Sequence, residues 1–116
     1  MLARFLALAV LFCWATLPAG AHHGWGSYDA KSPTMVEGKI LTSQYENPHV
    51  TLTVQGPGKV WTVTLAPPSR MQNRGAIAKL VPVGDMIKAY GYPSTREKDE
   101  MRAERITIEG KTYEMR

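Results

Sequence analysis

The sequence predicts a mainly β fold, a small barrel of five strands with one short helix between the third and fourth strands. Two patterns support this class. Apolar and polar residues alternate along several segments, which is the period of a strand with one buried face. Glycines and prolines separate these segments, as they do at turns. The length of 116 residues leaves room for one small domain and excludes a multidomain enzyme.

Residues 1–21 have the features of a secretory signal peptide. Arg4 gives a positive start, residues 5–17 are apolar apart from Thr16, and residues 19–21 are the small residues of a cleavage site. An apolar run of 13 residues is too short for a membrane span, which needs about 20. We therefore expect a cleaved precursor, a periplasmic or secreted mature chain, and no stable membrane insertion after cleavage.

Composition limits the chemistry of the mature chain. The single cysteine, Cys13, lies within the predicted signal peptide, which excludes disulfides, cysteine-rich zinc modules and iron–sulfur sites from the mature chain. Histidines and carboxylates are then the remaining metal ligands. Cleavage removes Arg4 and no acidic residue, so the formal net charge falls from +4 to +3. This charge is small for a protein that binds nucleic acid through phosphates, and we expect no nucleic-acid partner.

The first three strands are predicted between residues 34 and 65. Apolar residues alternate with charged ones after Thr34 and with polar ones after His49. Gly56-Pro57-Gly58 interrupts the second pattern with residues that strand interiors exclude, so the second and third strands should form a hairpin. The residues expected to face the core in this hairpin are Val50, Leu52, Val54, Trp61, Val63 and Leu65.

A short helix is predicted next. Two prolines end the third strand because proline has no N–H to donate to a ladder, and Ser69 is well placed to cap a helix that extends to about Lys79. Gly75 weakens this helix. The remaining expected elements are a fourth strand over residues 86–92, a charged exposed loop over residues 94–100, a fifth strand over residues 103–108 and a short terminal strand near Tyr113.

This order of elements is that of the OB-fold, a small Greek-key barrel whose helix lies between its third and fourth strands. An ordinary small β-sandwich with one helix is the alternative. We favour the barrel because a short five-stranded sheet has exposed edges unless it closes. The chain is thus divided into a signal peptide (residues 1–21), an amino-terminal arm (residues 22–33) and an OB-like barrel (residues 34–116).

Three histidines, His22, His23 and His49, are the candidate metal ligands, and two of them adjoin the predicted cleavage site. Cleavage after Ala21 would make His22 the amino terminus, whose free amine and ring nitrogen can chelate one Cu(II), with His23 or His49 adding a second imidazole. Cleavage one or two residues earlier would instead put a histidine third from the terminus. Amine, two deprotonated amides and imidazole then form the square-planar nitrogen set that copper and nickel favour.

The alternative is that these histidines are simply solvated. A ligand role for His49 requires the arm to fold back against the start of the second strand. Two glycines in the arm permit this, and burial of Trp25 and Tyr28 would anchor it. His49 follows a proline corner, Asn47-Pro48, which is a feature that is usually structural, and the alternation of the strand points its side chain away from the core.

Six short motifs are spread along the mature chain: His22-His23-Gly24-Trp25, Asn47-Pro48-His49, Arg74-Gly75, Gly84-Asp85, Arg105-Ile106 and Gly110-Lys111. Together they resemble a family of small exported bacterial proteins that is classified as a domain of unknown function. The resemblance extends over residues 22–114. It implies a signal peptide, a His-His start to the mature chain, an Asn-Pro-His motif before the second strand and a compact β-rich fold. It implies no activity.

We therefore expect a non-enzymatic binding protein. The mature chain has no cysteine nucleophile, no Gly-x-Ser-x-Gly motif and no His-Glu-x-x-His motif. Its expected ligand is copper, held by His22 with His23 or His49. The alternative is a structural or interaction module that engages another protein of the cell envelope and binds no metal. A minor alternative is an OB domain that binds single-stranded nucleic acid or an anionic ligand through Arg70, Arg74, Lys79, Lys88 and Arg96.

Overall fold

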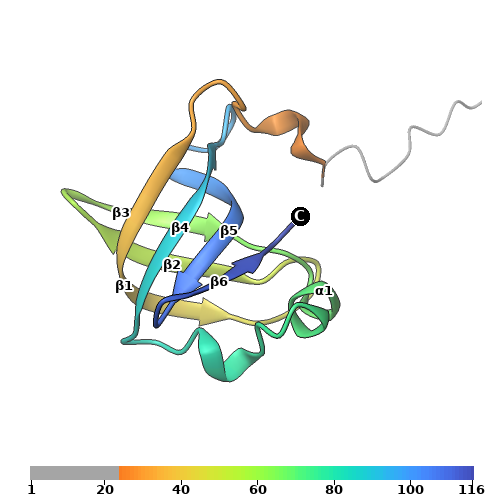
Figure 1. Ribbon diagram of the computed structural model, residues 1–116. Helices are drawn as coiled ribbons and strands as arrows, with labels where there is room; N and C mark the ends of the chain where they lie inside the picture. Colours follow the sequence, from red (N-terminus) through yellow and green to blue (C-terminus); the bar gives the residue numbers. More distant parts are fainter. Residues whose placement is uncertain (1–23) are drawn as a thin grey trace, which may run out of the picture.

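Residues 24–116 are described in the computed structural model, and they form one curled β-sheet with a short helix at its end (Figure 1). The predicted signal peptide, residues 1–21, and the candidate ligands His22 and His23 lie outside the described residues. The strands of the sheet are β1 (Thr34–Gln44), β2 (Thr51–Gly56), β3 (Lys59–Thr64), β4 (Met86–Pro93), β5 (Glu100–Ile108) and β6 (Lys111–Glu114). No helix in this part of the chain is long and apolar enough to cross a membrane.

The sheet closes into a barrel through a parallel pairing of β3 with β5. The strand order is β3-β2-β1-β4-β5-β6, and neighbours in this order pair antiparallel. At the closure, Thr62 is opposite Glu100, and Thr64 is opposite Arg102. The sixth strand, β6, pairs with the second half of β5 on the edge opposite β4, the same edge that β3 meets at the start of β5. The predicted mainly β, five-stranded barrel with one helix between the third and fourth strands is confirmed, with β6 as an additional strand.

The barrel interior holds the apolar residues that the alternation predicts. Burial of such a side chain stabilises the fold by about 1.5–3 kcal/mol. The fully buried residues of the β2–β3 hairpin and its flanks are Val50, Leu52, Val54, Val63 and Leu65. Trp61 differs from the prediction, because it packs against the core but is only partly buried. The ammonium group of Lys59 lies 3.9 Å from the centre of the Trp61 ring.

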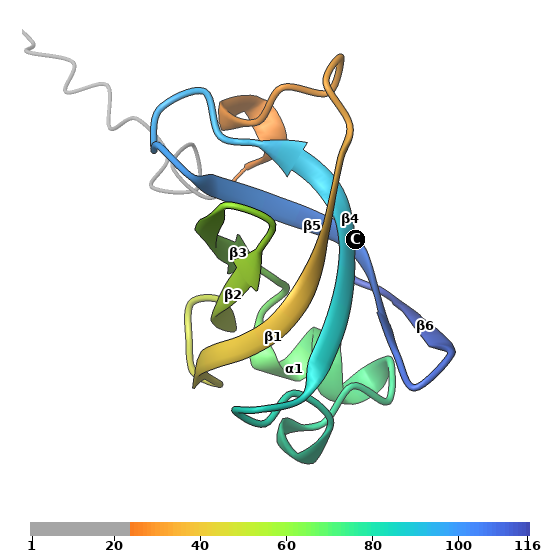
Figure 2. The ribbon, with the colours of Figure 1, turned by 90° about the vertical axis from the view of Figure 1, so that its left-hand side faces the viewer.

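The helix is shorter than predicted, and Ser69 does not cap it. Helix α1 spans Pro68–Asn73 and begins without a side-chain cap. Gly75 ends the helix with a φ of +84°, a conformation that residues with a side chain rarely adopt. The N–H groups of Gly75 and Ala76 donate to carbonyl oxygens of the helix, as in a Schellman C-cap. A separate 3-10 turn, η3 (Ala78–Leu80), occupies the end of the predicted helix. Figure 2 shows α1 lying across one end of the barrel.

Gly38 lies where β1 passes close to β2. A Cβ atom at this position would stand 1.8 Å from the carbonyl oxygen of Gln55. Gly38→Ala should therefore force the two backbones apart and lower the free energy of unfolding by about 2 kcal/mol or more. Gly26→Ala is the matched control, because a Cβ atom there meets nothing within 4 Å. Urea denaturation measures both variants, and equal midpoints would contradict this packing.

Candidate functional site

A pocket of about 220 Å³ opens beside the barrel closure. The residues around it include Gly24, Tyr28, His49, Thr64, Glu100 and Arg102. Thr64 and Arg102 are paired residues of the closure itself. Tyr28 belongs to the arm, and His49 belongs to the corner before β2. Four segments that are distant in the sequence therefore meet at one place.

His49 is the predicted ligand that lies within the described residues, and its side chain lines this pocket. The peptide bond between Asn47 and Pro48, just before it, is cis. The corner is held against the end of β3, because Leu65 N–H donates to the carbonyl oxygen of Val50 at 2.8 Å. Val50 is fully buried, whereas His49 is half-buried and lines the pocket.

Glu100 is a pocket residue that sequence reasoning missed. The charge pattern predicts an exposed loop over residues 94–100, but Glu100 is the first residue of β5 and is half-buried. Its Oε1 atom accepts hydrogen bonds from the hydroxyl groups of Tyr28 at 2.8 Å and Thr64 at 2.9 Å. Burial and the hydrogen bond to Glu100 raise the pKa of Tyr28 to about 12. The phenol therefore keeps its proton at neutral pH and acts as a hydrogen-bond donor.

Arg102 forms the inner wall of the pocket and is only 5% exposed. Its guanidinium lies 4.3 Å from the centre of the Trp25 ring and 5.9 Å from that of Tyr28. An aromatic face attracts a cation through its quadrupole, and this attraction is strongest where water is excluded. Burial lowers the pKa of Arg102, because removal from water disfavours the charged form. The two rings offset part of that penalty.

Trp25 connects the amino-terminal arm to the barrel. It lies in a short 3-10 turn, η2 (Trp25–Ser27), and the guanidinium of Arg116 is 4.8 Å from its ring centre. Tyr28 and Tyr92 make edge-to-face contacts with the same ring, at centre distances of 6.3 and 6.1 Å. Trp25 and Tyr28 thus contact the barrel, but both are only half-buried, whereas the sequence predicts burial of both. Guanidinium groups, rather than core residues alone, are the partners of Trp25.

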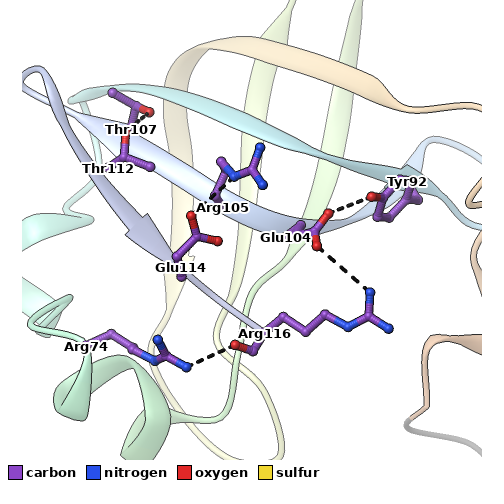
Figure 3. A network of polar contacts seen from close by, with 8 residues as sticks. All are labelled: Arg74, Tyr92, Glu104, Arg105, Thr107, Thr112, Glu114 and Arg116. Carbon is purple, nitrogen blue, oxygen red and sulfur yellow. Dashed lines mark hydrogen bonds and ion pairs between the residues drawn. The ribbon is translucent and has the colours of Figure 1, made fainter.

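A polar network surrounds Arg116 (Figure 3). Its guanidinium lies 3.9 Å from Oε1 of Glu104, and its main-chain oxygen accepts a hydrogen bond from Arg74 at 3.0 Å. The Tyr92 hydroxyl donates a hydrogen bond of 2.5 Å to Glu104, and this bond raises the pKa of Tyr92 to about 12. Arg74, predicted on an exposed basic face, is exposed but also bonded to the carboxyl-terminal segment.

The docked arm ends at the pocket that contains His49. Gly24 lines the pocket, and His23 directly precedes Gly24 in the sequence. Within residues 24–116, no group of three or more His, Cys, Asp or Glu side chains could hold a metal ion. A metal site in this pocket would therefore need donors from outside the described residues.

Alkaline pH should destabilise the fold partly through Tyr28. Its pKa rises from 10.0 to about 12 on folding, so its contribution to stability is complete below pH 10 and is lost as the pH rises from 10 to about 12. Tyr28→Phe has no phenol to ionise. Its free energy of unfolding should fall less steeply across this window than that of the wild type. Chemical denaturation at several pH values measures the slopes, and parallel curves would exclude this role of Tyr28.

The barrel is similar to part of several solved structures. A ZRD-deleted mutant of TiaS in complex with agmatine has a TM-score of 0.54 and 23% sequence identity, over 75% of this chain and 27% of that chain. Apo TiaS, a tRNA agmatidine synthetase, has a TM-score of 0.50 and 23% identity, over 69% and 18% of the two chains. A tRNA fluorescent labeling enzyme has a TM-score of 0.51 and 22% identity, over 69% and 18%. This chain spans about a quarter of the length of these proteins or less, and the likeness concerns the fold alone.

No curated protein sequence matches the chain. The model of a family of unknown function, DUF6152, matches residues 10–114. This range includes every pocket residue named above, from Gly24 to Arg102. The chain therefore belongs to the DUF6152 family of unknown function.

Proposed function

We propose that this chain is an exported, non-enzymatic protein that binds Cu(II) with its mature amino terminus beside His49. One observation carries the proposal. Gly24 and His49 line the same pocket, and the pair His22-His23 directly precedes Gly24 in the sequence. This arrangement would let a terminal amine and up to three imidazoles reach one ion.

The chemistry of these donors suits copper. In the form that begins at His22, the amine and the imidazole of the same residue make a chelate, and His49 or His23 supplies a further nitrogen. Cu(II) binds nitrogen sites more tightly than the other divalent first-row ions and favours a tetragonal arrangement. In the forms that begin one or two residues earlier, the third residue completes a square of four nitrogens without His49. A contribution from His49 therefore distinguishes the first form from the others.

The docked arm supports such a site because it lowers the entropy lost when an ion binds. Trp25 lies near two guanidinium groups, those of Arg102 and Arg116, and the N–H of Asp29 donates to the carbonyl oxygen of Pro93 at 2.9 Å. Ordering the backbone of one residue costs about 1–2 kcal/mol. The part of the arm from Gly24 onward is already ordered by folding, so it does not lose this free energy again on binding.

An interaction module of the cell envelope that binds no metal is the second candidate. The observation that favours it is the exposure of large apolar side chains: Met35 is 55% exposed, Met86 is 60% exposed and Val83 is 62% exposed. Met35 and Met86 lie near opposite ends of the paired region of β1 and β4. Singly exposed apolar residues are common on soluble proteins, so this candidate has less support than copper binding.

Copper titration of the exported protein tests the proposal. Mass spectrometry first defines the natural terminus. The mature form is then compared with the same chain whose terminal amine is acetylated. Competition with a chelating dye should show about tenfold or weaker Cu(II) binding by the acetylated form, because the blocked amine can no longer act as a ligand. Equal and weak affinity in the two forms would eliminate the metal proposal.

Trp25 should matter for copper binding only through His49. Trp25→Ala releases the arm, so the mature protein should lose about the same affinity as His49→Ala, and combining the two substitutions should cause little further loss. Trp61→Phe is the control, because this tryptophan lies on β3 beside Lys59 and does not line the pocket. Fully additive losses in the double variant would show that arm docking and His49 act independently.

A further inference from the structure

Four aromatic rings, those of Tyr28, Trp25, Tyr92 and Tyr90, form a continuous row from the arm to β4. Tyr28 and Tyr92 each contact the ring of Trp25 edge to face, at centre distances of 6.3 and 6.1 Å. Tyr90 lies two residues before Tyr92 on β4 and contacts its ring at a centre distance of 6.1 Å. Aromatic rings at these separations are in direct contact. An electron can therefore pass along the aromatic row from one ring to the next.

The aromatic row connects two pockets. Tyr28 lines the pocket that contains His49. At the other end, Tyr90 lines a second pocket of about 100 Å³, together with Met35 and Arg105 among others. Among residues 24–116, the two pockets have no lining residue in common. The row thus leads from the first pocket to a different part of the surface.

Two phenols of the aromatic row donate hydrogen bonds to carboxylates. Tyr28 donates to Oε1 of Glu100 at 2.8 Å, and Tyr92 donates to Oε2 of Glu104 at 2.5 Å (Figure 3). A phenol becomes a strong acid when it loses an electron, so its oxidation needs a base that accepts the proton. A carboxylate at hydrogen-bond distance is such a base. Both contacts therefore make these tyrosines easier to oxidise, because the electron and the proton leave together.

We propose that the aromatic row is a relay that carries oxidising equivalents from the pocket that contains His49 to the second pocket at Tyr90. The oxidant is a one-electron oxidant in the first pocket, such as a radical derived from hydrogen peroxide. The final electron donor is a soluble reductant, such as a thiol, that reaches Tyr90. The relay would protect His49 and its neighbours from oxidation. This function goes beyond copper binding and does not require it.

Trp25 differs from the tyrosines of the aromatic row because two cations lie against its ring. The guanidinium groups of Arg102 and Arg116 are 4.3 and 4.8 Å from the ring centre. A positive charge at this distance opposes removal of an electron from the indole, because the radical cation that forms is repelled. Trp25 is therefore the bridge of the relay, and the oxidised state rests on Tyr28 and Tyr92 on either side of it.

The first transfers balance in electrons and protons. The oxidant takes one electron from Tyr28, and the phenol proton moves to Glu100 along its hydrogen bond. The tyrosyl radical at Tyr28 then takes one electron from Tyr92 through the ring of Trp25. Glu100 returns the proton to Tyr28, and Glu104 accepts the proton of Tyr92.

The last transfers bring the oxidised state to Tyr90. This residue gives one electron to the Tyr92 radical, Glu104 returns the proton to Tyr92, and the phenol proton of Tyr90 passes to water. One electron and one proton from the reductant then restore Tyr90. The net result is that one electron moves from the reductant to the oxidant and one proton from the reductant enters water, while the relay is unchanged.

Directed photo-oxidation of the exported protein tests the relay without copper. The predicted mature chain has no cysteine, so Thr51→Cys in the first pocket provides one attachment site for a photo-activated ruthenium oxidant. Illumination in the absence of a reductant should give the electron paramagnetic resonance signal of a tyrosyl radical and, by peptide mass spectrometry, oxidised Tyr90. Unmodified Tyr90 in this labelled parent protein would overturn the proposal.

Trp25→Phe and Tyr92→Phe interrupt the relay in the labelled protein. Both variants keep an aromatic ring for packing, but a phenylalanine ring is much harder to oxidise than indole or phenol. Each substitution should abolish oxidation of Tyr90 and increase oxidation at the first pocket, on Tyr28 and His49. Thermal unfolding checks that each variant keeps the fold.

Trp61→Phe and Tyr45→Phe are the matched controls. They make the same chemical changes in two partly buried side chains that belong neither to the aromatic row nor to either pocket. Oxidation of Tyr90 should be unchanged in both. Undiminished oxidation of Tyr90 in Trp25→Phe or in Tyr92→Phe, or an equal loss in the controls, would overturn the relay. Because no copper is present, these outcomes are independent of the copper titration.

Discussion

The parallel pairing of β3 with β5 is the constraint on which the rest of this structure depends. It closes the barrel and puts Thr64 opposite Arg102. It also brings Glu100 close enough to accept a hydrogen bond from the hydroxyl group of Thr64. One wall of the pocket is therefore a direct product of barrel closure. Without this pairing, the sheet would keep two open edges and the carboxylate would lose its hydroxyl partners. The residues that close the barrel are therefore also residues of the pocket.

Arg102 extends this arrangement to the amino-terminal arm. A buried guanidinium is unfavourable unless other groups compensate for the lost water, and the ring of Trp25 is one such group. Trp25 also lies near Arg116, whose guanidinium is 3.9 Å from the carboxylate of Glu104. Gly24 is consequently held at the pocket. The buried guanidinium of Arg102 therefore forms part of the surface on which Trp25 of the arm packs.

The barrel itself says little about function. Membership of the DUF6152 family brings no activity, and the similarity to TiaS structures covers a small part of those proteins. Barrels of this kind have many unrelated functions, and function depends on the groups attached to them. In this chain, Gly24 of the arm and His49 line one pocket, and the proposed copper site rests on this arrangement.

The sequence by itself determined the strands, their turns and the core, because a period of two and the positions of glycine and proline are local signals. It also named His49 and Trp25, which lie at the pocket and beside the guanidinium of Arg102. Local signals misjudged the length of α1, where the left-handed Gly75 ends the helix. They also misplaced Glu100, whose bonds to Thr64 and Tyr28 join residues 36 and 72 positions apart. Only the tertiary structure decided the pocket, since its walls meet through a pairing of strands that no short segment of sequence encodes.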